Sequence, residues 1–337
     1  MIKKLFSTLF IDIRGEIVRV VQGKTVDSNL NILVEAFGTL ELPGNGGPNP
    51  DPKLLKENAA RLKAFLREQK INAARVVAGL GLNGIIARNV RVPKLEPKDL
   101  DQMMNLEIND YLPVSRDEYI FDYKVLDEVE EDERCFLDLI VAAVNTKQAE
   151  HSTQLFELAG LKPVVLDILP NMMHRLFGFM SGRDIMVLDG GREGTHLSIF
   201  KGKSLFMYAD IPFIYNREDS DISVLASEMR GYLDFFSSRN FGKNVDSIII
   251  VGELAEIDTI QYDLGYYVAV PVSVGLEQAG MLTFKGCSFA DHAALYAGNL
   301  GLMMRGKDHK STRAVKQAKA AGIDLSENRS MGTGISV

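Results

Sequence analysis

The sequence predicts an α/β protein made of two similar sheets and a small inserted α/β subdomain. Strands and amphipathic helices alternate along the chain, an Asp-containing hairpin recurs in the two halves, and the pattern changes between residues 81 and 162. Duplication of such a hairpin predicts two sheets that face each other across a cleft. We therefore expect a first lobe over 1–80, the insert over 81–162, a return to the first lobe over 163–182 and a second lobe over 183–304.

Composition and charge narrow the classes of function. Among the 337 residues, 46% are apolar and 25% are charged, which is typical of folded globular domains. The formal charge of −7 provides no basic field for nucleic-acid phosphates, so we expect no nucleic-acid partner. Cys135 and Cys287 form no Cys-x-x-Cys pair, which favours a reducing cytoplasm. The histidines include no His-x-x-x-His pair, and we expect no metal site.

The first elements are predicted to be three consecutive strands. Residues 9–13 and 17–21 are apolar and β-branched, and Arg14-Gly15-Glu16 between them predicts a tight hairpin. A third strand over 32–42 leads into a loop over 43–52, where proline removes backbone donors and glycine adds backbone entropy.

The start of the chain imitates a signal peptide without matching one. Asp12 and Arg14 end its apolar run, and no small-residue cleavage site follows. No segment approaches the roughly 18 consecutive apolar residues that a bilayer-spanning helix needs. We therefore expect the chain to reach a membrane only through partners.

The later elements are predicted from helical or alternating apolar spacing. The expected helices are 54–66, 97–112, a segment from Thr146 to the capping Gly160, a segment from Pro170, 221–236, a segment through Leu264, and 290–304. The expected strands are 75–78, a segment through Val92, 119–125, 135–144, 164–168, three strands within 185–211, 247–251 and 268–271.

The order of these features resembles the actin, sugar kinase and heat-shock ATPase superfamily, which implies an actin-like (RNase H-like) two-lobed fold. Within that superfamily the chain is most similar to the PilM family of type IV pilus assembly proteins, over most of residues 6–304. FtsA and GspL are related, and a GspL-like cytoplasmic component of type II secretion is the alternative. The segments that carry the resemblance are Arg88-Asn89-Val90-Arg91-Val92-Pro93-Lys94, Met103-Met104-Asn105-Leu106-Glu107, Tyr111-Leu112-Pro113 and Asp122-Tyr123-Lys124-Val125-Leu126.

The resemblance implies a nucleotide site, but the sequence departs from the superfamily pattern. The first phosphate hairpin normally reads Asp-x-Gly, whereas Arg14 replaces that glycine and Gly15 follows one position late. Leu169 replaces an acidic residue that orients water in relatives, and the glycine run of the adenosine motif is reduced to Gly252 before Glu253. We expect a non-catalytic protein with no cofactor or with residual ATP and magnesium. The residues implied for the vestigial site are Asp12, Gly15, Asp189, Gly191, Thr195 and Gly252.

Two alternative interpretations of these residues stay open. In one, the protein is an active ATPase or sugar kinase that uses Asp12, Asp189 and Thr195, with Asp167 in place of the missing acid. In the other, the two aspartates bind nothing and only close their hairpins.

The resemblance also implies a partner and a location. In the PilM family, the N-terminal cytoplasmic tail of the inner-membrane protein PilN lies in a groove between the first lobe and the insert. We expect a PilN-like partner that adds an extended segment to a sheet edge, with Arg88, Tyr111 and Pro113 near the groove. A scaffold of this kind is cytoplasmic, peripheral to the inner-membrane face, and in contact with other pilus inner-membrane components.

The last segment of the sequence, 305–337, has the composition of a flexible polar tail. It carries seven Lys or Arg against three Asp or Glu, and its apolar residues are sparse.

Overall fold

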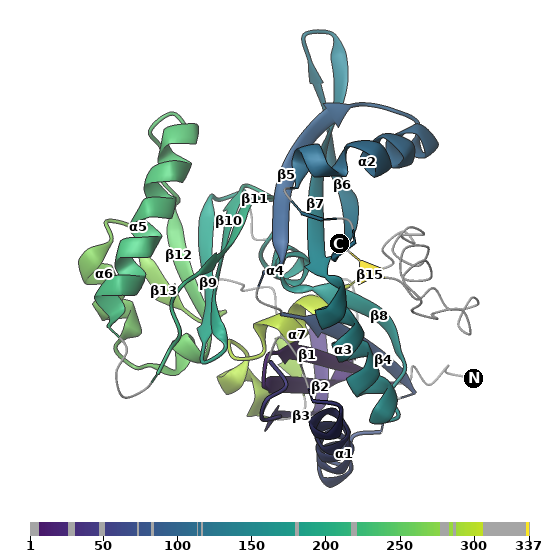
Figure 1. Ribbon diagram of the computed structural model, residues 1–337. Coiled ribbons are helices and arrows are strands. Elements are labelled where there is room, and N and C mark those ends of the chain that lie inside the picture. Colours follow the sequence, from purple (N-terminus) through teal and green to yellow (C-terminus); the bar gives the residue numbers. More distant parts are fainter. Residues whose placement is uncertain are drawn as a thin grey trace.

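The chain folds around three β-sheets, of seven, five and three strands (Figure 1). We call the seven-stranded sheet with its helices the first lobe, the five-stranded sheet with its helices the second lobe, and the three-stranded sheet with α2 the insert. The computed structural model describes residues 7–25, 31–46, 51–72, 74–81, 84–112, 114–115, 117–178, 182–216, 221–276, 283–285, 288–305 and 335–336.

The first-lobe sheet has the strand order β14-β3-β2-β1-β4-β8-β15. Strands β1, β2 and β3 form the expected antiparallel run, and β4 and β8 continue the sheet in parallel with β1. The residues of β1 are almost all buried, as a strand covered on both faces requires. The bounds are β1 (Thr8–Arg14), β2 (Ile17–Thr25), β3 (Asn31–Glu41), β4 (Arg75–Leu80), β8 (Pro163–Ile168), β14 (Thr283–Lys285) and β15 (Ile335–Ser336).

Helix α1 (Pro52–Glu68) covers the first lobe and begins two residues before the predicted helix 54–66. Asp51 caps it by accepting a hydrogen bond from the backbone N–H of Lys53, and Pro52 suits the first helical turn. Its apolar face, which includes Leu55, Leu62 and Leu66, is buried in the core.

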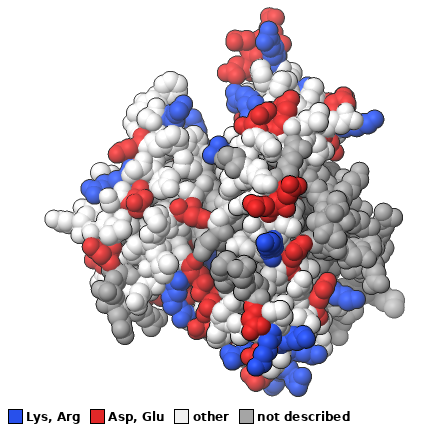
Figure 2. Space-filling model, in the orientation of Figure 1, with Lys and Arg blue, Asp and Glu red and all other residues white. Residues whose placement is uncertain are grey.

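The insert is a three-stranded antiparallel sheet in the order β5-β7-β6, covered by α2. Its strands are β5 (Ile86–Pro93), β6 (Tyr119–Glu131) and β7 (Arg134–Asn145), and α2 (Pro97–Tyr111) packs Leu100, Met104 and Ile108 onto them. The β6–β7 hairpin extends away from the body of the molecule (Figure 1). Acidic side chains gather at its tip (Figure 2), among them Glu130, Glu131, Asp132 and Glu133.

Two helices lead the chain out of the insert. Helix α3 (Thr146–Leu158) is capped by Asn145, and Gly160 closes its end with a φ of 78°, as predicted. Helix α4 (Leu169–Phe177) follows β8 and packs against α7 (Ala297–Met303). Helices α4 and α7 lie between the sheets of the two lobes (Figure 1).

The second-lobe sheet repeats the strand order of the first. Its order, β11-β10-β9-β12-β13, matches β3-β2-β1-β4-β8, including the antiparallel run and the parallel pair β9–β12. This confirms the predicted duplication of sheets in a two-lobed fold. The bounds are β9 (Ile185–Gly191), β10 (Gly194–Lys201), β11 (Ser204–Ile211), β12 (Ser247–Gly252) and β13 (Val272–Val274).

Strand periodicity divides the core of the second lobe between two faces. Met186 and Leu188 point toward α5 (Ile222–Arg239) and α6 (Ile260–Tyr267), whereas Ile185 and Val187 belong to the core shared with the first lobe. The lobes are therefore joined by a continuous apolar interior as well as by α4.

The predicted strand 268–271 is wrong. The N–H of Val268 donates to the carbonyl of Leu264 at the end of α6, and Pro271 has no N–H to donate to a ladder. Pairing with β12 therefore begins after the proline, at Val272 opposite Ile248.

The predicted single helix 290–304 is also wrong. The chain forms a short 3₁₀ helix, η2 (Ser288–His292), and then α7. The carbonyl of Ala294 accepts the N–H of Ala297 at 3.3 Å and that of Gly252 on the neighbouring β12 at 3.0 Å, so this segment has i to i+3 hydrogen bonds in place of α-helical ones.

Two further expectations concern membranes and the tail. None of the described helices is both long and apolar enough to cross a membrane. Of the expected tail 305–337, the structure describes Arg305 and β15, which pairs in parallel with β8. The rest of that segment lies outside the described residues.

Candidate functional site

The two duplicated hairpins meet between the lobes. Gly15 and Glu16 form the two-residue turn of the first hairpin, and Arg192 and Glu193 form that of the second. The registers correspond, because Asp12 lies opposite Arg19 as Asp189 lies opposite His196. Each aspartate therefore has a basic residue directly opposite it on the neighbouring strand.

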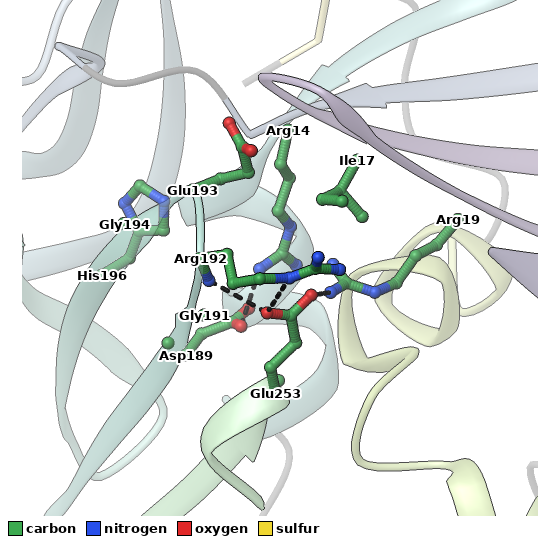
Figure 3. A pocket seen from close by; sticks show the side chains of 12 residues that line it. Arg14, Ile17, Arg19, Asp189, Gly191, Arg192, Glu193, Gly194, His196 and Glu253 are labelled. Atoms are coloured by element: carbon green, nitrogen blue, oxygen red, sulfur yellow. Dashed lines mark hydrogen bonds and ion pairs between the residues drawn. The ribbon is translucent and has the colours of Figure 1, made fainter. Parts of the chain in front are cut away.

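Arg14 joins the two predicted aspartates. Its Nε and Nη2 donate to Oδ2 of Asp12 at 3.0 and 2.8 Å, and its Nη1 lies 2.6 Å from Oδ1 of Asp189. The Arg14 side chain is 8% exposed and both carboxylates are buried. Because Asp12 belongs to β1 and Asp189 to β9, this guanidinium links the lobes (Figure 3).

Electrostatics stabilise the charged forms of Arg14 and Asp189 but not that of Arg19. Burial disfavours the charged form of Arg14, yet the Asp12 and Asp189 carboxylates outweigh burial and raise the pKa of this guanidinium. Burial likewise opposes ionisation of Asp189, but Arg14 outweighs it and lowers the pKa of this carboxyl. Burial, followed by the charge of Arg14, lowers the pKa of Arg19.

A second set of ion pairs is centred on Glu253, which begins the short 3₁₀ helix η1 (Glu253–Glu256). Its Oε1 lies 2.9 Å from Nη2 of Arg19 in the first lobe, and its Oε2 accepts the backbone N–H of Arg192 at 2.9 Å. Arg192 also reaches Glu41 of β3 at 3.6 Å. Arg14, Arg19 and Arg192 thus converge on the carboxylates of Asp189 and Glu253 (Figure 3).

The carboxylate of Glu193 fills the space beside the first turn. It accepts the backbone N–H of Glu16, and burial followed by the charge of Glu16 raises the pKa of Glu193. Gly15 has a φ of 51°, and a Cβ there would collide with this carboxylate. Gly15 therefore serves the contact between the two turns.

The other predicted glycines also permit close approach within the protein. Gly252 has a φ of 77°, and a Cβ there would lie 2.6 Å from Oδ1 of Asp189. A Cβ at Gly191 would lie 3.0 Å from Oε2 of Glu253. Each glycine thus makes room for a carboxylate of the cluster.

The remaining residues of the proposed catalytic alternative are not arranged for water activation. Asp167 accepts from Asn171 at 2.8 Å and forms a short ion pair with Arg175, so both of its oxygens are engaged. Leu169 is fully buried at the start of α4. Thr195 is buried beside Gly190, and its Oγ1 has no hydrogen-bond partner among the described residues.

The superfamily implies a magnesium nucleotide at this position, and the residues present do not fit one. Such a ligand requires carboxylate oxygens that face the metal and hairpin amides that face phosphate. Here Arg14 stands between the carboxylates, and carboxylates accept the amides of Glu16 and Arg192. The cavity that the cluster lines has a volume of about 10 Å³, which is about the space of one water molecule.

The structure brings together five of the residues predicted for the nucleotide site. Asp12, Gly15, Asp189, Gly191 and Gly252 surround the cluster, with Thr195 adjacent. Of the residues predicted to bind a partner, the exposed Arg88 lies on β5, and Tyr111 ends α2, where its hydroxyl donates to Glu107 at 3.0 Å. Pro113 lies outside the described residues.

Sequence reasoning missed Arg19 as a member of the site. The available signal is a single basic residue inside the apolar strand Ile17-Val18-Arg19-Val20-Val21, where burial requires a charged partner. That partner is Glu253, which lies 234 residues away in the sequence. Its identity follows only from the way the two lobes meet.

The lowered pKa of Asp189 predicts a specific acid sensitivity. The unfolded chain binds a proton at Asp189 near pH 3.9, whereas the folded protein binds it only at lower pH. The contribution of ionised Asp189 to the free energy of unfolding is complete above about pH 3.9 and is lost as pH falls below about 4. Urea unfolding between pH 6 and 3 should therefore show that the free energy of unfolding falls more steeply with decreasing pH for the wild type than for Asp189→Asn. Equal slopes would contradict this assignment.

Comparisons with known proteins extend this description. The family model described as type IV pilus assembly protein PilM matches residues 11–217. A solved PilM-PilN type IV pilus biogenesis complex contains a similar chain, with a TM-score of 0.73 and 19% identity over 88% of this chain and 98% of that chain. At this identity the likeness shows the fold. No curated protein sequence matches significantly.

Two other solved structures are more distant. A Bacteroides thetaiotaomicron protein with an actin-like ATPase fold has a TM-score of 0.49 and 11% identity over 83% of this chain and 96% of that chain. The ethanolamine utilization protein EutJ from Carboxydothermus hydrogenoformans has a TM-score of 0.48 and 12% identity over 91% of this chain and 94% of that chain.

Proposed function

Because this chain belongs to the PilM family of type IV pilus assembly proteins, we propose that it is a non-catalytic actin-like scaffold that holds the N-terminal cytoplasmic tail of an inner-membrane PilN-like protein. The observation that carries this proposal is the similarity over nearly the whole chain to a protein solved as a PilM-PilN complex. The scaffold works on the cytoplasmic side of the inner membrane, where such a tail would bring it into contact with other pilus components.

The insert supports this proposal because it is braced on both sides. At its base, the lower parts of β6 and β7 share the first-lobe core through Ile120, Ile140 and Val144. On the other side, the N–H of Gly84 donates to Asp210 at 2.8 Å, and Asn89 donates to the carbonyl of Leu205. A platform held in this way loses little conformational entropy when a peptide binds.

An extended tail is the kind of ligand that sheets in this arrangement can accept. Sheet edges bind such segments through main-chain hydrogen bonds, while neighbouring side chains read alternate residues. Arg88 and Tyr111 remain our candidates for that reading, as an exposed cation and an amphipathic aromatic side chain on the insert.

The partner assignment is tested with the N-terminal cytoplasmic peptide of the PilN-like protein from the same organism. We expect the full-length protein to bind this peptide, and Tyr111→Ala to raise the Kd by at least about tenfold through loss of an aromatic anchor. Tyr262→Ala is the matched control, because Tyr262 is 78% exposed on α6 of the second lobe. No binding by the wild type would refute the proposal, and equal loss in both variants would refute the role of Tyr111.

A working ATPase or sugar kinase is the competing function, and it predicts a different outcome. A nucleotide present at one hundred times its Kd would stabilise the fold by about 2.7 kcal/mol. We expect ATP with magnesium to leave the midpoint of thermal unfolding of the wild type unchanged, because Arg14 and the cluster carboxylates occupy the required contacts. Steady phosphate release that disappears in Asp189→Asn would overturn the non-catalytic assignment.

A further inference from the structure

We propose that Arg14 is the resident ligand of this cleft, so that the protein closes its own lobes with a guanidinium where relatives of the superfamily hold a metal nucleotide. The cleft is then a dicarboxylate site whose cation belongs to the same chain. This inference does not depend on which partner the insert binds.

Asp12 and Asp189 provide the two carboxylates that Arg14 bridges. Two buried carboxylates from different lobes repel each other unless a cation lies between them. Arg14 contacts one at 2.8 Å and the other at 2.6 Å, and its planar fork presents several donors at once. A lysine ammonium would supply the charge without this fork.

Glu193 and Glu253 provide the carboxylates that accept the backbone amides of the two hairpin turns. Backbone amides at hairpin turns form natural anion sites. The amide of Glu16 donates to the carboxylate of Glu193, and the amide of Arg192 donates to that of Glu253 at 2.9 Å. Side chains of this protein therefore stand where phosphate oxygens would otherwise accept these hydrogen bonds.

The cluster also joins the lobes at more than one point. Arg14 links β1 to β9, Arg19 links β2 to η1 at 2.9 Å, and Arg192 links the second hairpin to Glu41 of β3. The first two pairs are largely buried, so salt screens them weakly. These pairs hold the lobes together, and a ligand that needed an open cleft would have to break them.

The test measures amide hydrogen exchange in the two hairpins of the full-length protein. Arg14→Ala should increase exchange by at least about tenfold around residues 13–17 and 190–194, because loss of the buried cation frees both turns. Millimolar ethylguanidinium, or magnesium ion alone, should reduce exchange in Arg14→Ala and leave the wild type unchanged. Arg91→Ala is the matched control, since that arginine forms ion pairs on the exposed face of the insert.

Each outcome of this experiment decides the proposal. Unchanged hairpin exchange in Arg14→Ala, or slower exchange in the wild type on addition of ATP with magnesium, would overturn it. If Arg14→Ala does not fold, Arg14→Lys answers the same question through an intermediate increase in exchange that ethylguanidinium does not reverse. Exchange in Arg14→Lys equal to that of the wild type would overturn the role of the guanidinium fork.

Discussion

Replacing Arg14 by methionine is expected to lower the free energy of unfolding by about 3–5 kcal/mol, because it leaves buried carboxylates without their cation. Methionine keeps most of the side-chain volume, so the loss reports the charge rather than a cavity. Asp12 and Asp189 are both at most 2% exposed and cannot recover this loss through hydration. Urea unfolding at pH 7, followed by circular dichroism, measures the difference.

The pH dependence of this variant separates a lost ion pair from a general packing defect. Without Arg14, burial is the largest influence on Asp189 and outweighs the smaller opposing effects of His196 and Arg19, so the pKa of this carboxyl should rise. The variant should therefore recover part of its deficit as pH falls toward 5, whereas a packing defect would stay constant. Arg91→Met is the control, because Arg91 is 42% exposed and its surface pairs contribute about 0–1 kcal/mol. A loss in Arg14→Met no larger than in Arg91→Met would refute the assignment.

The second large effect is expected at the crossing of α4 and α7, the two helices between the lobes. A Cβ at Gly301 would overlap the carbonyl oxygen of Met172, a backbone atom that cannot rotate away. Gly301→Ala should therefore lower the free energy of unfolding by about 1–3 kcal/mol through overpacking. It should do so although alanine has the higher intrinsic helix propensity.

Gly231→Ala is the matched substitution in α5 and should have the opposite sign. Outside the surrounding backbone of α5, no atom of the described residues lies within 4 Å of a Cβ at Gly231, so alanine there reduces the entropy of the unfolded chain without a clash. We expect a gain of about 0.4–1 kcal/mol in chemical denaturation. A stabilising effect of Gly301→Ala would show that α4 and α7 do not approach each other as described.

Most elements were predictable because their signals are local. Helix α1 follows from apolar spacing, and the duplicated hairpins follow from apolar strands on either side of short turns. The two wrong elements depend on hydrogen bonds that apolar spacing does not report. Within 290–304 the carbonyl of Ala294 accepts from both Ala297 and the distant Gly252, and Val268 continues the hydrogen bonding of α6.

The candidate site was predictable in part. The repeated hairpins indicated that Asp12 and Asp189 correspond, and the departure at Arg14 indicated an altered nucleotide site. The residues that neutralise the cluster were not predictable. Arg14 follows Asp12 by two residues in the sequence, yet its second partner comes from a strand in the other lobe.

Hydrophobic periodicity and turn chemistry were sufficient to specify strands, helices and the repetition of a sheet, because these properties depend on residues a few positions apart. The packing of the two lobes against each other determined which ion pairs the charged residues form. A long arginine side chain can meet many partners, and its choice depends on which carboxylates burial brings within about 3 Å. The packing of the two lobes keeps water from these charges, so each charge must be neutralised by another side chain. Asp12 and Asp189 consequently bind Arg14, and Glu253 binds Arg19.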